Sequence, residues 1–88
     1  MKEYTVKVYK DRTEWYFEGK LHREKDPAIE YANGDKFWYK NGKLHREDGP
    51  ANVYQGTKGW HLNHKCYGYN NDFTVESWKF FIKTLIFP

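Results

Sequence analysis

An internal repeat constrains the fold of this chain more than any other feature of its sequence. The segment Lys20-Leu21-His22-Arg23-Glu24 recurs as Lys43-Leu44-His45-Arg46-Glu47, and the difference between positions 43 and 20 gives a period of 23 residues. The match extends on both sides, pairing Trp15-Tyr16 with Trp38-Tyr39 and Pro27-Ala28 with Pro50-Ala51. Weaker copies flank the two full ones, with Val8-Tyr9 upstream and Trp60 downstream. Eroded terminal copies are typical of stacked arrays.

Turn signals inside each copy indicate short antiparallel strands. Asn41-Gly42 separates two strand-like segments and is a strong signal for a tight hairpin, because a type I′ turn needs positive φ at both central residues. Asn33-Gly34 and Asp48-Gly49-Pro50 mark further turns. The sequence therefore predicts an antiparallel β-meander of 23-residue hairpin repeats, with strands at 4–9, 14–17, 20–23, 28–31, 36–40, 43–46, 51–55, 60–63 and 65–68.

The pattern changes after Phe73. Apolar residues then recur at three- and four-residue spacings, which predicts one amphipathic C-terminal helix over 72–87, capped by Asp72 or Thr74. An exposed stripe containing Trp78 would be a liability, so we expect the helix to pack on a face of the sheet. The predicted fold class is mainly β (α+β), as a single domain over 1–88 with the meander at 1–68.

Composition narrows the class of protein. A chain of 88 residues suits one domain, and its mean hydropathy of −1.06 excludes a membrane span. Aromatic residues make up 20% of the chain, which supplies the apolar area for a small core. Cys66 is the single cysteine, so no internal disulfide forms, and no signal peptide follows Met1. We therefore expect a cytoplasmic protein, whose net charge of +3 permits nucleic-acid binding without requiring it.

Tight turns also predict which side chains share a face of the sheet. One predicted face, the expected bed for the helix, carries Tyr16, Leu21, Ala28, Phe37, Tyr39, Leu44, Ala51 and Val53. The other carries Trp15, Phe17, His22, Ile29, Tyr31, Trp38, His45 and Tyr54, together with Lys20, Lys36, Lys40 and Lys43.

The second predicted face holds the candidate binding residues, which are Trp15, His22, Tyr31, Trp38, Lys40, Lys43, His45 and Tyr54. Aromatic rings interleaved with lysines are typical of surfaces that bind single-stranded nucleic acid. Rings with histidine and arginine suit a protein interface equally well. A purely structural role, as ordinary cross-strand pairs and solvated turns, is the third interpretation.

Chemical sites have little support in the sequence. The repeated His-Arg-Glu places an imidazole beside carboxylates, but adjacent strand residues point to opposite faces, and we interpret the motif as a structural ladder. His61, His64 and Cys66 offer only weak support for a zinc site. We predict no catalytic residue, no metal and no cofactor.

The segment Trp38-Tyr39-Lys40-Asn41-Gly42-Lys43-Leu44-His45-Arg46-Glu47-Asp48-Gly49-Pro50-Ala51 resembles the "WYxNGKLHREDGPA" repeat of small proteins from bacteriophages and large DNA viruses, similar in style to the MORN-variant repeats of antitoxin-like bacterial proteins. The resemblance covers roughly residues 13–55 well and 56–68 poorly.

The resemblance implies a hairpin scaffold that binds and inhibits a host macromolecule, such as a defence nuclease, a toxin or a CRISPR effector, in the host cytoplasm. RNA or single-stranded DNA binding is the alternative. Self-association through the strand edges at 4–9 and 60–68 is a third hypothesis.

Overall fold

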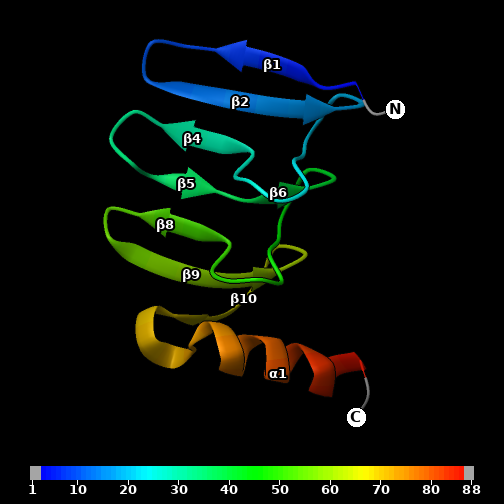
Figure 1. The fold of residues 1–88 in the computed structure, drawn as a ribbon, viewed down its shortest axis with the longest axis vertical. Helices are drawn as coiled ribbons and strands as arrows, with labels where there is room; N and C mark the ends of the chain where they lie inside the picture. Colours follow the sequence, from blue (N-terminus) through cyan, green and yellow to red (C-terminus); the bar gives the residue numbers. More distant parts are fainter. Residues whose placement is uncertain (1–2, 87–88) are drawn as a thin grey trace.

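The computed structural model describes residues 3–86 as an antiparallel sheet of hairpins followed by one helix (Figure 1). This architecture confirms the predicted fold class, and every predicted strand segment overlaps an observed strand. The strands are β1 (Thr5–Val8), β2 (Arg12–Phe17), β3 (Lys20–Leu21), β4 (Ile29–Tyr31), β5 (Lys36–Phe37), β6 (Tyr39–Lys40), β7 (Lys43–Leu44), β8 (Asn52–Tyr54), β9 (Thr57–Leu62) and β10 (Lys65–Tyr69). A 3₁₀ turn, η1 (Asn70–Asp72), leads into the helix α1 (Val75–Ile86).

The strands form two sheets instead of the single continuous meander that the turns predict. The larger sheet has eight strands in the order β1-β2-β4-β5-β8-β9-β10, with β3 paired to β2, and the smaller one is the hairpin β6-β7. The predicted strand 36–40 is thus divided at Trp38. Tyr39 pairs with Leu44 and Lys40 with Lys43, as the Asn41-Gly42 turn predicts.

A loop interrupts each full repeat, and it changes the predicted pairing. The N–H of Trp15 donates to the carbonyl oxygen of Ala28 at 2.8 Å, and its own carbonyl accepts from the N–H of His22 at 3.1 Å. Residues 22–28 therefore leave the sheet, so β3 and β4 both lie beside β2. Trp38 makes the same two bonds, to Ala51 and His45.

The predicted register between the second hairpin and β8 is therefore wrong. β7 pairs with β6, whereas β8 pairs with β5 and β9, so Leu44 does not lie opposite Val53, nor Arg46 opposite Ala51. Phe37 lies opposite Ile29 and Asn52. The loop of residues 45–51 separates β7 from β8. The predicted meander has a tight turn at this position and therefore pairs the wrong strands.

The third repeat has a bulge in place of the loop. β9 and β10 pair directly, and their register shifts between Cys66 and Gly68, which leaves Tyr67 as the extra residue. Gly68 then lies opposite Trp60, the counterpart of Trp15 and Trp38. Tyr67 and Gly68 thus stand where residues 22–28 stand in the first repeat.

The helix packs over this shortened third repeat. Trp60, Trp78 and Ile82 form the buried cluster, with Leu62, Tyr67, Phe73 and Phe81 packed against it. Thr74 caps the helix: its Oγ1 accepts from the N–H of Ser77 at 3.1 Å, and the Oγ of Ser77 accepts from the N–H of Thr74 at 2.8 Å. The helix begins three residues later than predicted, and residue 87 lies outside the described residues.

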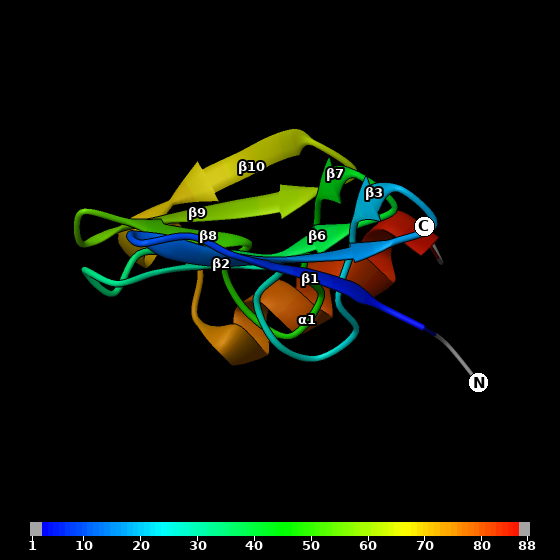
Figure 2. The same cartoon turned by 90° about the horizontal axis from the view of Figure 1, so that it is seen from above.

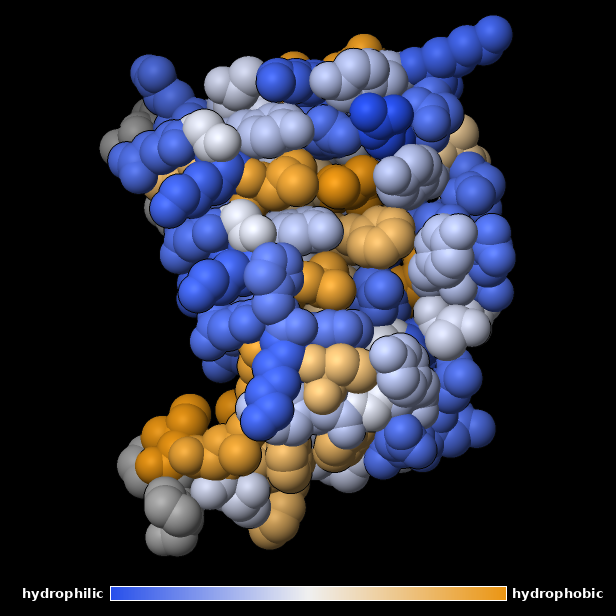
Figure 3. Space-filling model, turned by 180° about the vertical axis from the view of Figure 1, so that it is seen from behind, coloured by the Kyte–Doolittle hydropathy of each residue, from blue (hydrophilic) through white to orange (hydrophobic). Residues whose placement is uncertain are grey.

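The two faces of the sheet differ in what covers them. We call the face that carries Trp15, Trp38 and Trp60 the helix side, because α1 and the two loops lie on it (Figure 2). We call the opposite face, which carries Ile29, Phe37 and Tyr54, the open face. No element within residues 3–86 packs across the open face, which Figure 3 shows from behind.

The helix therefore lies on the face opposite to the predicted bed. Tyr16, Leu21 and Phe37 do share a face, as predicted, but that face is left open. Val53 belongs to the helix side, because it lies opposite Lys36 and Lys58. Conversely, the predicted second face is divided: Trp15, Phe17 and Trp38 lie on the helix side, and Ile29, Tyr31 and Tyr54 on the open face.

Candidate functional site

The structure separates the eight predicted binding residues into three locations. Trp15, Trp38, His22 and His45 take part in packing between repeats. Lys40 and Lys43 lie at the β6-β7 turn, and Tyr31 and Tyr54 lie on the open face. The predicted combination of lysines and exposed rings on one face is therefore not formed.

His22 and His45 join neighbouring repeats. The Nδ1 atom of His22 accepts the main-chain N–H of Asn41 at 2.9 Å, and Nδ1 of His45 accepts that of Asn63 at 3.1 Å. Nε2 of His22 lies 3.1 Å from a carboxylate oxygen of Glu24, and His45 is placed in the same way toward Glu47, at 3.2 Å. The His-Arg-Glu motif thus orients an imidazole between a turn of the next repeat and its own glutamate.

Trp15 and Trp38 lie under arginines. The Cζ atom of Arg23 lies 3.9 Å from the ring centroid of Trp15, and that of Arg46 lies 3.9 Å from the ring centroid of Trp38. Arg46 also donates to the carbonyl oxygen of Pro50 at 3.2 Å. Guanidinium groups therefore occupy the positions over these indoles at which a nucleic-acid base would stack.

Lysines collect on the helix side. Lys36 lies opposite Val53 and Lys20 opposite Phe17, so register directs both lysines away from the open face. Lys40 and Lys43 line a groove beside α1. Lys58 also lies opposite Val53. Lys7 points to the open face with Glu14, and its amine lies 4.6 Å from the ring centroid of Tyr16.

The predicted Tyr31 and Tyr54 belong to a row of tyrosines along one margin of the open face. Tyr31 lies opposite Arg12 on this face. Tyr54 lies opposite Thr57 and shares the face of Asn52, which is two residues earlier in the same strand. Register adds Tyr69, opposite Gly59, and the turn beside Arg12 adds Tyr9. Tyr9, Tyr54 and Tyr69 are 43%, 50% and 57% exposed. Sequence reasoning missed Tyr9 and Tyr69 as site residues, although Tyr9 aligns with Tyr54 in the repeat.

An apolar stripe runs beside the tyrosine row. Leu21 lies opposite Tyr16, and Ile29 lies opposite Phe37, whose ring centroid is 5.8 Å from that of Tyr31 and 6.2 Å from that of Tyr54. Figure 3 shows the stripe as orange and tan groups in the middle of the face, bordered by blue. The open face therefore presents tyrosine hydroxyls beside a partly buried apolar stripe, in which Ile29 is 9% exposed.

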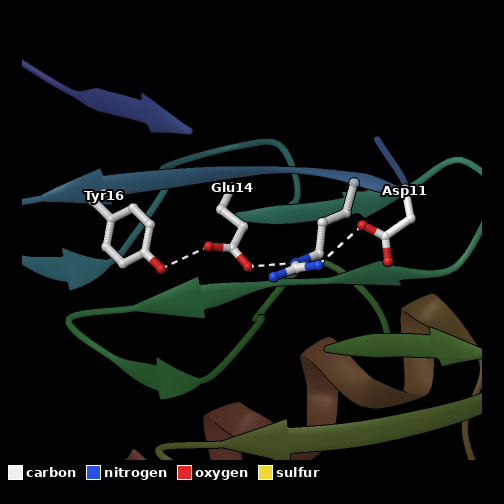
Figure 4. Close-up of polar contacts among 4 residues, drawn as sticks. Asp11, Glu14 and Tyr16 are labelled. Carbon is white, nitrogen blue, oxygen red and sulfur yellow. Dashed lines mark hydrogen bonds and ion pairs between the residues drawn. The ribbon is translucent and has the colours of Figure 1, made fainter. Parts of the chain in front are cut away.

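A polar chain at the N-terminal end of the open face joins Arg12 to two carboxylates and a tyrosine hydroxyl (Figure 4). Glu14 is 8% exposed and accepts from Arg12 Nε and from the hydroxyl of Tyr16, both at 2.7 Å. Arg12 also donates to Asp11 at 2.9 Å. The hydrogen bond from Arg12 lowers the pKa of Glu14 against the opposing effect of burial. A carboxylate held ionised by two donors suits positioning of side chains better than proton transfer.

A groove lies next to the helix end. It has a volume of about 420 Å³ and separates the β6-β7 turn from the last turns of α1. Its walls combine the predicted residues Lys40, Lys43 and His45 with Leu62, Ile82, Leu85 and Ile86 and with the polar Asn41, Glu47 and Asn63. Leu85 and Ile86 are 45% and 60% exposed, so the final part of the predicted helical stripe borders this groove instead of entering the core.

Within residues 3–86, no group of three His, Cys, Asp or Glu side chains is placed to hold a metal ion. The twelve-residue α1 is too short to cross a bilayer, and the described part of the chain has no longer helix. Comparison with known protein families, curated proteins and solved structures gives no match.

Proposed function

We propose that this chain is a non-enzymatic binding protein that holds a protein partner on its open face. The observation that carries the proposal is the combination of the tyrosine row with the apolar stripe, on a face that no described element covers. Tyrosine is enriched at protein interfaces because its ring contributes apolar area while its hydroxyl bonds to polar groups.

The dimensions of the molecule support this proposal. The principal extents of the molecule, helix included, are 40 × 31 × 17 Å, so it is a thin slab with one broad free face. A specific protein complex of standard size buries about 800 Å² on each partner. A face of these dimensions provides that area without any change in backbone conformation.

Inhibition by occlusion is the form of activity that we propose, as the repeat's resemblance to phage and viral proteins implies. A rigid sheet that covers a partner's working surface needs no catalytic group of its own. The partner class that follows is a host macromolecule such as a defence nuclease, a toxin or a CRISPR effector, encountered in the host cytoplasm.

The distribution of charge favours protein over nucleic acid as the ligand. A single-stranded nucleic acid needs cations beside the rings on which its bases stack. Here Lys20, Lys36 and Lys58 lie on the helix side. Two cations of the open face, Lys7 and Arg12, already lie over the rings of Tyr16 and Tyr9. We therefore propose a protein partner, and the experiment below also checks for RNA binding.

The test is capture from nuclease-treated host lysate with a tagged chain and paired variants. We expect one stoichiometric protein to be retained by the wild type and lost on the double substitution Tyr31→Ala and Tyr54→Ala. Phe80→Ala is the matched control, because Phe80 is a 70% exposed ring on the helix, and it should leave capture unchanged.

Two results would overturn the proposal. One is capture lost with Phe80→Ala and kept with the tyrosine double variant, which would place the contact on the helix. The other is a low-salt gel shift with RNA or single-stranded DNA that disappears steeply as salt rises, together with no retained protein.

A further inference from the structure

No strand within residues 3–86 pairs with the outer edge of β1. β1 ends the order of the larger sheet, and all four of its residues are exposed. Val6 lies opposite Trp15, whose N–H and carbonyl are bonded to Ala28 and His22 on the far side of β2. Because bonding alternates along an antiparallel pair, Val6 and Val8 direct their N–H and carbonyl groups away from β2.

This edge lacks the features with which sheets usually avoid pairing with other chains. β1 contains no proline, and its register with β2 runs without a bulge from Thr5 to Val8. Its charged residue, Lys7, lies over Tyr16 of its own sheet, 4.6 Å from the ring centroid, and so does not guard the edge. At the other end of the sheet, by contrast, β10 is bulged at Tyr67 and α1 packs against that residue.

The side-chain pattern of the edge is symmetric about Val6. Tyr4-Thr5-Val6-Lys7-Val8 reads apolar, polar, apolar, polar, apolar in both directions. A two-fold axis at Val6 therefore places Val6 opposite Val6 of a second copy, Tyr4 opposite Val8, and Thr5 opposite Lys7. Shifting the axis to Lys7 would instead oppose two lysines, which is destabilising.

We propose that β1 pairs antiparallel with β1 of a second copy of this chain, with Val6 on the two-fold axis. The pairing joins the two large sheets into one and leaves both open faces on the same side. It also covers Val6 and Val8, which are 47% and 77% exposed in the single chain. Because the seam is short compared with a standard interface, the dimer forms in a concentration-dependent way.

The first test is the mass of the full chain in solution, measured by analytical ultracentrifugation across a wide concentration range. We expect the mass to rise from that of one chain, 10.7 kDa, toward twice that value. Val6→Pro removes an outward N–H that β2 does not use, and edge strands tolerate such prolines. Because Val6 faces its own copy across the axis, the substitution removes both hydrogen bonds of that pair, and the dimer dissociation constant should be at least about tenfold higher.

A matched pair of charge variants tests the same edge without introducing a proline. Val8→Lys puts a charge on the edge and should weaken the dimer by a similar factor, whereas Val75→Lys makes the same change at an exposed position of the helix and should not. A mass that stays at one chain at all concentrations would overturn the proposal. So would a dimer that Val6→Pro and Val8→Lys leave unchanged.

The second test measures the register by disulfide formation in a Cys66→Ser background. Val6→Cys should cross-link two copies rapidly under mild oxidation, because directly opposed residues lie within disulfide range. Val8→Cys faces Tyr4 of the second copy and should cross-link slowly. Faster cross-linking of Val8→Cys or Lys7→Cys than of Val6→Cys would overturn the register.

Discussion

The indole Nε1 of Trp78 donates a hydrogen bond to the main-chain carbonyl oxygen of Arg46, over a distance of 3.0 Å. This bond joins the helix to the second repeat. The ring of Trp78 also packs against Trp60 of the third repeat, with 5.5 Å between the two ring centroids. Arg46 in turn covers Trp38. One buried side chain thus links the helix to two successive repeats.

Trp78→Phe should destabilise the fold by about 2 to 6 kcal/mol. The substitution leaves a buried carbonyl without its donor and a cavity beside Trp60, and each effect costs about 1 to 3 kcal/mol. Urea unfolding followed by circular dichroism measures the change. Phe80→Leu, at a 70% exposed position of the same helix, should stay within about 0.5 kcal/mol of the wild type. Equal losses in the two variants would contradict the bridging role.

His22→Ala should cost more than His45→Ala, although the two residues occupy the same place in the repeat. Each substitution leaves a turn N–H without its acceptor, but the side chain of His22 is 3% exposed and that of His45 is 13% exposed. Water therefore replaces the lost bond less readily at His22, and we expect about 2 kcal/mol there against about 1 kcal/mol at His45. Thermal unfolding compares them, and a larger cost at His45 would refute the assignment.

Arg46→Lys should destabilise the chain by about 1 to 2 kcal/mol, even though charge is conserved. A lysine does not reproduce a planar group stacked on Trp38 that also donates to Pro50. Tryptophan fluorescence during unfolding reports the change. Arg23→Lys is the internal comparison, because Arg23 covers Trp15 in the same way and should show a similar loss.

Stability should fall as the pH drops below about 6.5, and His61 should contribute to that fall. Burial lowers the pKa of His61 from its ordinary value of 6.5, so the unfolded chain binds the proton more readily than the folded one. The loss begins near the unfolded value and continues until the folded imidazole also titrates. His61→Gln should flatten the stability profile in this range, and an unchanged profile would contradict the assignment.

Glu14→Gln should remove a second, more acidic part of the pH dependence. The pKa of Glu14 is lowered from its ordinary value of 4.5, chiefly by the hydrogen bond from Arg12. The stabilisation it provides is present above that value and is lost as the pH falls through the folded pKa. The variant should be less stable than the wild type near neutral pH, and the two should converge in acid. Chemical denaturation at several pH values measures both.

The hairpins and the helix could be predicted because their signals are local. Asn41-Gly42 specifies its own turn, and the spacing from Val75 to Ile86 specifies a helix without reference to the rest of the chain. Asn41 and Gly42 indeed have φ of 53° and 80°. Tyr16, Leu21 and Phe37 were also placed correctly on one face, since short-range alternation determines it.

The location of the helix could not be predicted from local signals. Residues 45–51 read as a turn between paired strands, but Trp38 bonds to both ends of this segment and holds it out of the sheet. Trp15 does the same for residues 22–28, and the two loops change the strand neighbours and therefore the faces of Ile29, Tyr31 and Tyr54. Only the long-range packing of Trp78 on Trp60 decides which face is covered, and with it which face stays free.

The bulge at Tyr67 has a consequence for the length of the array. A full loop at this position would occupy the space above Trp60 in which Trp78 lies. The shortening from seven residues, 22–28, to two, 67–68, therefore ends the series and makes room for the terminal helix. The two preceding repeats keep the full loop, so another repeat can follow each of them. Duplicating residues 22–44 would therefore give a protein one module longer, with both of its ends unchanged and its tyrosine row extended by one ring.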